Sequence, residues 1–256
     1  MWSLIILGAL QGLTEFLPVS SSGHLIVLRT LFGMALPGAT VEVALHAGTL
    51  ASVLLYYRPW IAKWVRQLTR GERAAWRYFM RLTVASLPAG ALGIGFGHVI
   101  EDYFTVSAAV IGWLLTAVLL WVMPSPKEDR QSTPSMGLLG YLLIGLAQGL
   151  ALWPGLSRSG STIAMGRAVG LDPEEAARFS FLMAVPAVLG ALVFEIPSLR
   201  LSGIPWMDMT LAALVAAMAG LVAIQWVTRI VNHPHAWRGF AIYLVLAAVA
   251  VRIFGG

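Results

Sequence analysis

Six long apolar stretches constrain the fold of this chain more than any other feature. They cover residues 41–57, 79–100, 106–123, 177–195, 209–231 and 237–253. Each is close to the length of about 20 residues that an α-helix needs to cross a bilayer. Charged residues make up 11% of the chain, against roughly a quarter of an average soluble domain, which excludes a water-soluble globule. We predict an all-α integral membrane protein with six transmembrane helices, folded as one membrane domain over residues 1–256.

Two further apolar regions, 3–34 and 138–170, are interrupted midway by proline, serine and glycine. The interruptions are PVSSSGH at 18–24 and PGLSRSG at 154–160. Each half is too short to cross a bilayer alone. The sequence therefore predicts two re-entrant helix-loop-helix segments in addition to the six spans.

The two interrupted regions also resemble each other. LGALQGLTEFLPVSSSGHLI and IGLAQGLALWPGLSRSGSTI align Gln11 with Gln148 and, after a one-residue gap, Ser21 with Ser157. Three predicted spans follow each copy, so the two halves have opposite orientations. We predict an inverted-topology repeat with halves of about 1–123 and 137–256, joined by the short polar loop 124–136.

Basic residues orient the predicted spans. Residues 58–81 hold seven lysines and arginines but one acid, Glu72, and this bias places them in the cytoplasm. Counting spans from there puts Asp102 and both termini outside. The same bias explains the net charge of +5 without nucleic acid as a partner, and the absence of cysteine excludes thiolate chemistry and disulfides.

The interruptions predict a polar pocket. Irregular backbone is tolerated at membrane depth only where protein or a water-filled cavity satisfies its polar groups. A helix begins after each interruption, and its free N–H groups favour an anion such as phosphate. Glu15, His24 and Arg158 lie in or beside the interruptions and need partners or a ligand. Arg158 offers a planar fork of donors for phosphate, and Gln11 shares a helical face with Glu15. The hydroxyls expected around this pocket belong to Ser20, Ser21, Ser22, Ser157, Ser159 and Thr162.

Several of these residues have simpler interpretations. The serines of an interruption can cap helices, above all Ser20 and Ser22. Glu42 and His46 form a second pair four residues apart, for which a structural hydrogen bond and a site role are equally compatible. Asp172, followed by proline and two glutamates, is typical of a helix start.

With these motifs the chain resembles the undecaprenyl-diphosphate phosphatases of the bacitracin-resistance type. QGLTEFLPVSSSGH (11–24) is similar to the family's (Glu/Gln)-x-x-x-Glu motif with its serine and histidine extension. PGLSRSGST (154–162) is similar to its second motif. The likeness in length and hydropathy covers essentially the whole chain.

The resemblance implies hydrolysis of undecaprenyl diphosphate to the monophosphate and inorganic phosphate, which recycles the lipid carrier of cell-wall synthesis. It also implies a bacterial plasma membrane location, a site open to the outer face, and a divalent cation, Mg²⁺ or Ca²⁺. It associates Glu15 and Gln11 with the metal, Arg158 with the diphosphate, and Ser21 and His24 with catalysis. We assign Gln11, Ser22, Ser157, Ser159 and Thr162 to substrate binding together with Arg158. We also count Glu15 and Arg158 among the catalytic residues. The expected partners are a prenyl diphosphate lipid and membrane lipids, and a homodimer is compatible with the sequence.

Two questions stay open at this stage. The nucleophile is water or Ser21 activated by His24, or His24 itself. A secondary transporter or flippase of an anionic lipid or phosphate is the alternative function, because inverted repeats with broken helices are also a transporter architecture.

Overall fold

The structure is a computed structural model that describes residues 2–31, 33, 38–123, 137–199 and 205–254. Within these ranges every regular element is an α-helix. The helices are α1 (Trp2–Phe16), α2 (Ser21–Leu31), α3 (Gly38–Tyr56), α4 (Arg58–Thr69), α5 (Arg73–Glu101), α6 (Val106–Trp121), α7 (Leu138–Leu150), α8 (Arg158–Ala168), α9 (Pro173–Leu199), α10 (Trp206–Ile230) and α11 (Pro234–Phe254). The all-α class and the apolar, membrane-protein character predicted from the sequence are confirmed.

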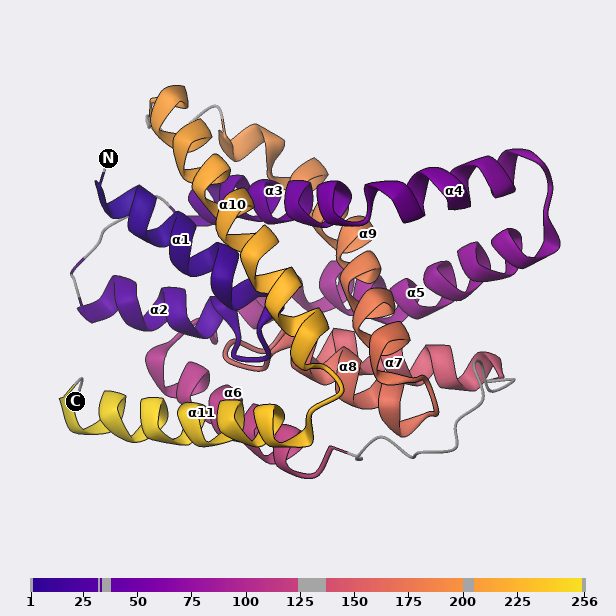
Figure 1. The fold of residues 1–256 in the computed structure, drawn as a ribbon. Coiled ribbons are helices and arrows are strands. Elements are labelled where there is room, and N and C mark those ends of the chain that lie inside the picture. The colour runs from indigo at the N-terminus through magenta and orange to yellow at the C-terminus, as the bar shows by residue number, and fades with distance from the viewer. Residues whose placement is uncertain (1, 32, 34–37, 124–136, 200–204, 255–256) are drawn as a thin grey trace.

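Each of the six expected spans corresponds to one helix. Four of these helices are long and apolar enough to cross a membrane: α5, α9, α10 and α11. The other two, α3 and α6, are apolar but shorter. α4 was not predicted as a helix; it continues the direction of α3 and, with the start of α5, projects beyond the rest of the molecule (Figure 1).

The two interrupted regions each form two helices, and the first helices of the two regions begin toward different edges of the molecule. Figure 1 shows α1 and α2 both reaching the edge where the two termini lie, whereas α7 begins toward the opposite edge. α1 packs mainly on α10, and α7 packs mainly on α5. The predicted linker 124–136 lies outside the described residues, so the proposed division into halves stays a prediction.

Local conformation explains where the helices break. Ser20 adopts a left-handed backbone conformation with φ of 66°, which ends the turn between α1 and α2. Gly155 does the same in the second interruption, with φ of 86°, a conformation that glycine adopts without steric cost. The start of α9 is capped as the sequence suggests, because Asp172 Oδ1 accepts a hydrogen bond from the backbone N–H of Glu175 at 2.8 Å.

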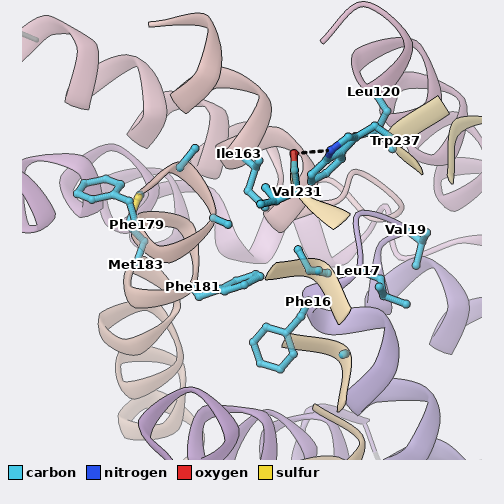
Figure 2. Close-up of a cluster of buried hydrophobic side chains, with 14 of the residues drawn as sticks. Phe16, Leu17, Val19, Leu120, Ile163, Phe179, Phe181, Met183, Val231 and Trp237 are labelled. Carbon is cyan, nitrogen blue, oxygen red and sulfur yellow. Dashed lines mark hydrogen bonds between the residues drawn. The ribbon is translucent and has the colours of Figure 1, made fainter. Parts of the chain in front are cut away.

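A buried apolar cluster supports the interruptions from one side (Figure 2). Phe16, the last residue of α1, meets Phe181 of α9 edge to face, with ring centroids 5.3 Å apart. Leu17 and Val19 in the first interruption and Ile163 of α8 belong to the same cluster. The first interruption and the helix that follows the second are therefore held by apolar packing.

Candidate functional site

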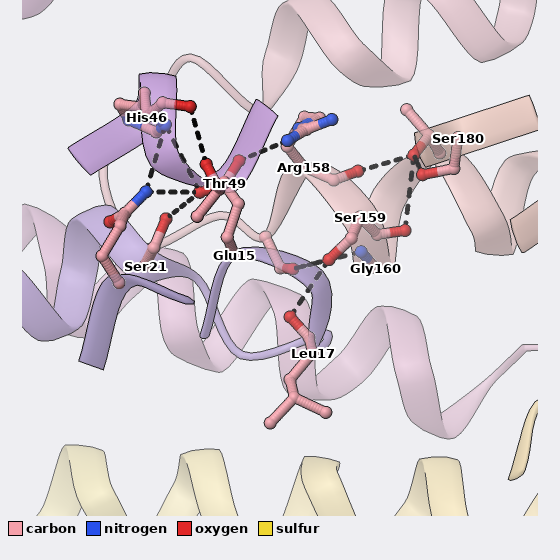
Figure 3. Close-up of polar contacts among 12 residues, drawn as sticks. Glu15, Leu17, Ser21, His46, Thr49, Arg158, Ser159, Gly160 and Ser180 are labelled. Carbon is pink, nitrogen blue, oxygen red and sulfur yellow. Dashed lines mark hydrogen bonds and ion pairs between the residues drawn. The ribbon is translucent and has the colours of Figure 1, made fainter. Parts of the chain in front are cut away.

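Glu15 is the centre of the polar cluster between the two interruptions (Figure 3). Its side chain lies near the end of α1 and is 7% exposed. Oε2 accepts hydrogen bonds from Ser21 Oγ at 2.6 Å and from Gln11 Nε2 at 2.9 Å. These contacts join the end of α1 to the first residue of α2, across the interruption that separates them.

Arg158 reaches the same carboxylate from the second half of the chain. Its Nη2 forms an ion pair with Glu15 Oε1. Arg158 is the first residue of α8. The second interruption therefore places a guanidinium group against the carboxylate of Glu15, which precedes the first interruption. Nη1 of Arg158 is buried and has no hydrogen-bond partner among the described residues.

His46 of α3 completes the cluster. Its Nδ1 lies 3.1 Å from Gln11 Nε2 and 3.6 Å from Glu15 Oε2. An amide nitrogen only donates, so Nδ1 of His46 accepts from Gln11. Glu42, its neighbour four residues earlier, lies apart from this cluster and pairs with Arg29 at 2.7 Å. The structure thus separates the two members of a pair that the sequence left undecided.

The hydroxyls of the second interruption bond to the protein itself. Ser157 Oγ caps α8 by accepting from the N–H of Gly160 at 3.1 Å. Ser159 Oγ donates to the carbonyl of Leu17 at 3.0 Å, which ties the two interruptions together. Thr162 Oγ1 donates to the carbonyl of Arg158 at 2.8 Å. These contacts position Arg158, and substrate binding by the three hydroxyls stays a prediction.

The first interruption places His24 away from Glu15. Nδ1 of His24 lies 2.7 Å from the carbonyl oxygen of Ser20, and Nε2 lies 2.8 Å from the hydroxyl of Tyr243 in α11. Ser20 Oγ accepts from the N–H of Gly23 at 3.3 Å and contacts Ser22 Oγ at 3.2 Å. Ser20 therefore caps α2, as its simpler interpretation suggested.

Comparison with known proteins shows the family to which this chain belongs. The family model described as "Bacitracin resistance protein BacA" matches residues 4–250. This chain belongs to the BacA family. Proteins named "Undecaprenyl-diphosphatase" are similar to it along nearly their whole lengths. One from Desulfatibacillum aliphaticivorans is 36% identical over 98% of this chain and 97% of its own. One from Thermomicrobium roseum is 40% identical over 90% of this chain and 89% of its own.

In this BacA family member four side chains that the sequence analysis singled out lie together. The structure also shows contacts to residues that the sequence analysis did not single out. Gln11, Glu15, Ser21 and Arg158 converge, whereas His24 contacts a different set of residues. Sequence reasoning missed Tyr243, which lies 219 residues after its partner. It also missed Ser180, whose hydroxyl lies 2.6 Å from that of Thr162. Neither residue stands in a motif, so the sequence held no signal for either.

The donor set around Glu15 fits a hard divalent cation. Oε1 of Gln11 is buried and has no hydrogen-bond partner in the described part of the chain. It lies one helical turn from a carboxylate, and Mg²⁺ and Ca²⁺ both take oxygen ligands, Mg²⁺ usually one or two carboxylates together with substrate phosphates and water. The described residues contain no cluster of three or more acidic, histidine or cysteine side chains that could hold a metal without further ligands. A metal bound here would therefore need further oxygen ligands, such as water or substrate phosphate.

Proposed function

We propose that this protein hydrolyses undecaprenyl diphosphate to undecaprenyl phosphate and inorganic phosphate. The single observation that carries the proposal is the meeting of Glu15, Ser21 and Arg158 at the two interruptions. Membership of the BacA family and similarity to proteins named undecaprenyl-diphosphatase over most of the chain support the same reaction. A transporter alternative explains the buried arginine but gives no reason for a serine hydroxyl bonded to a carboxylate.

Arg158 is suited to bind the diphosphate. Phosphoryl transfer needs the charge on the phosphate oxygens neutralised and the nucleophile held in line. One arm of the guanidinium is engaged by Glu15, and Nη1 has no partner among the described residues. A phosphate oxygen can satisfy this donor, and charge-assisted hydrogen bonds of this kind are the strong ones.

Ser21 is the nucleophile that the contacts favour. A nucleophile is recognised by its hydrogen bond to a base, which is oriented by further groups. Ser21 Oγ donates to Glu15, and Gln11 and Arg158 orient that carboxylate. In the proposed step Oγ bonds to the terminal phosphorus while its proton passes to Glu15. The bond to the bridging oxygen breaks and undecaprenyl phosphate leaves. Water then attacks the phosphorus on Ser21 and gives a proton to Nε2 of His24; the bond from phosphorus to Oγ breaks, Oγ takes back the proton held by Glu15, and inorganic phosphate leaves.

We further propose that Glu15 and Gln11 hold the divalent cation, Mg²⁺ or Ca²⁺, together with the substrate. When bound, the cation would supply charge neutralisation at the diphosphate oxygens. Gln11 would contribute a neutral amide oxygen, so Glu15 would be the only charged side chain among the protein ligands of the cation. Added metal should therefore raise the affinity for a non-hydrolysable prenyl diphosphate analogue, and Gln11→Ala should weaken that dependence.

The proposed setting is the bacterial plasma membrane, with six spans, two re-entrant pairs and a site open to the outer face. Three features support it: the apolar helices, the basic residues of the α4–α5 region, and the opposite edges toward which α1 and α7 begin in Figure 1. A homodimer is compatible with this arrangement. Lipid substrates with a polar head at membrane depth suit a pocket of this kind.

Phosphate release by detergent-solubilised protein tests the function, since no gradient exists there to drive transport. We expect the wild type to release phosphate from a prenyl diphosphate, and Arg158→Ala and His24→Ala to abolish release in folded protein. Arg229→Ala, which removes an exposed arginine of α10, is the matched control and should retain activity. A wild type that releases none supports the transporter, and normal turnover by Arg158→Ala overturns the proposed site.

A substrate labelled in its terminal phosphate identifies the nucleophile. An acid-stable label on the protein that is lost in Ser21→Ala but retained in Ser22→Ala indicates phosphoserine at position 21. An acid-labile label that depends on His24 indicates attack by the imidazole instead. Turnover without any trapped label, after rapid quenching, supports direct attack by water.

A further inference from the structure

We propose that Tyr243 is a positioning residue for His24, an inference that rests on the proposed function. The hydroxyl of Tyr243 lies 2.8 Å from Nε2 of His24. The two rings are also stacked, with centroids 5.8 Å apart and planes inclined by 4°. One side chain of α11 thus fixes both the hydrogen bonding and the plane of an imidazole that belongs to α2.

The two ring nitrogens of His24 have different partners, which sets its tautomer. The carbonyl oxygen of Ser20, 2.7 Å from Nδ1, only accepts, so Nδ1 carries the hydrogen. In the neutral ring Nε2 is then the acceptor, and the Tyr243 hydroxyl donates to it. The left-handed conformation of Ser20, with φ of 66°, belongs to the turn that presents this carbonyl. Tyr243 therefore holds the one basic nitrogen that His24 has available.

A second aromatic residue limits rotation of the same ring. Trp113 of α6 packs on His24 with centroids 4.7 Å apart and planes inclined by 48°. α2 and α11 both pack on α6, so three helices meet at this imidazole. A general base or nucleophile must be oriented by a third group to act efficiently. For His24 the Ser20 carbonyl orients Nδ1 and Tyr243 orients the ring plane; the Tyr243 hydroxyl must leave Nε2 before that nitrogen takes a proton.

His24 lies apart from Glu15 but on the same helix as Ser21, whose hydroxyl bonds to that carboxylate. His24 lies three residues after Ser21 on α2, and residues with this spacing share a helical face. A ring held by Tyr243 keeps its place one turn beyond the serine. A ring without that partner keeps the Ser20 bond and the contact with Trp113 but has lost its partner at Nε2.

The test compares Tyr243→Phe with the matched variant Tyr56→Phe. Tyr243→Phe retains the stacked ring and removes only the hydroxyl. Tyr56→Phe removes another tyrosine hydroxyl with a single polar partner, Thr228 at 3.1 Å, away from the site. We expect Tyr243→Phe to lower kcat about threefold to tenfold, the range that a net hydrogen bond is worth, with KM little changed. Tyr56→Phe should leave both near wild type.

Nitrogen NMR on isotope-labelled histidine gives a readout that does not depend on turnover. His24→Gln assigns the His24 signals among the five histidines. In the wild type we expect the Nδ1–H tautomer with a hydrogen-bonded Nε2, and in Tyr243→Phe a shift of the Nε2 resonance toward that of a free acceptor. Tyr243→Leu, which also removes the stacked ring, should in addition shift the His24 ring protons.

The outcomes separate this inference from the proposed function. Unchanged kcat and an unmoved Nε2 resonance in Tyr243→Phe overturn the positioning role. Equal losses of activity in both tyrosine variants with an unmoved resonance overturn it as well, since they indicate a general packing effect. A wild type that releases no phosphate overturns the proposed function, while the Nε2 resonance still decides whether Tyr243 holds His24.

Discussion

At the scale of single residues, Glu15 has more polar partners than its surroundings would lead one to expect. It is almost buried, yet it faces Gln11, Ser21, His46 and Arg158. A buried charge is tolerated only when it is paired and hydrogen-bonded. Ser21 and Arg158 come from two other helices, and His46 of α3 joins through Gln11, so the cluster also ties the two interruptions to α3.

Neutralising Glu15 should therefore abolish phosphate release. Glu15→Gln removes the acceptor of Ser21 and the partner of Arg158, and we expect kcat to fall by at least about 100-fold, comparable to losing a preorganised electrostatic contact. Glu42→Gln is the matched control, because Glu42 is also paired with an arginine but lies outside the cluster. Phosphate release measured beside thermal unfolding distinguishes lost chemistry from lost fold. Similar losses in both variants would contradict the assignment.

Backbone strain at Ser20 gives a second prediction at this scale. Ser20→Ala and Ser20→Gly both remove the cap on the N–H of Gly23, but glycine adopts the left-handed conformation without steric cost. We expect Ser20→Gly to be more stable than Ser20→Ala by about 1 kcal/mol, measured as thermal unfolding in detergent. Equal stabilities, or the reverse order, would show that the strain is not stored at this residue.

At the scale of elements, close backbone contact holds each interrupted helix on its neighbour. A Cβ added at Gly8 of α1 would lie 2.5 Å from the carbonyl oxygen of Ala212 in α10. A Cβ added at Gly145 of α7 would lie 2.3 Å from the carbonyl oxygen of Ala85 in α5. The sequence alignment of the two regions pairs Gly8 with Gly145. α1 and α7 thus each contact a neighbouring helix through a glycine at the same position of the alignment. This correspondence supports the proposed repeat.

Adding a methyl group at either glycine should destabilise the fold. Gly8→Ala and Gly145→Ala force the helices apart, and overpacking of this kind costs about 1–3 kcal/mol. Gly90→Ala in α5 is the matched control, since a Cβ there meets nothing within 4 Å. Alanine favours a helix over glycine, so the control should unfold at the wild-type temperature or above it. A destabilised control, or unaffected Gly8→Ala and Gly145→Ala, would contradict this packing.

At the scale of the whole molecule, the two interruptions lie against each other, although α1 and α7, which lead into them, begin toward opposite edges in Figure 1. Three contacts cross between the interruptions or the helices beside them: Arg158 with Glu15, Ser159 with Leu17, and Phe16 with Phe181. The first two contacts are polar and the third is apolar. The site therefore depends on both halves of the chain at once.

Labelling of single cysteines tests this arrangement in membranes. The chain has no cysteine of its own, so each introduced thiol reports one position. We expect Trp2→Cys and Asp102→Cys to react with an impermeant maleimide from the outside, and Arg70→Cys and Ala168→Cys from the cytoplasm, because basic residues place the α4–α5 turn inside. Reaction of Trp2→Cys and Asp102→Cys from different sides would exclude the re-entrant first pair.

The sequence by itself determined the all-α membrane class, the two interruptions and the polar residues Gln11, Glu15, Ser21 and Arg158. Apolar length and local motifs carry this information, because each depends on residues close together in the chain. Only the tertiary structure decided that His46 joins Glu15 while Glu42 does not, that Ser159 bonds to Leu17, and that Tyr243 holds His24. These contacts join segments up to 219 residues apart, and the packing of whole helices sets which of them meet.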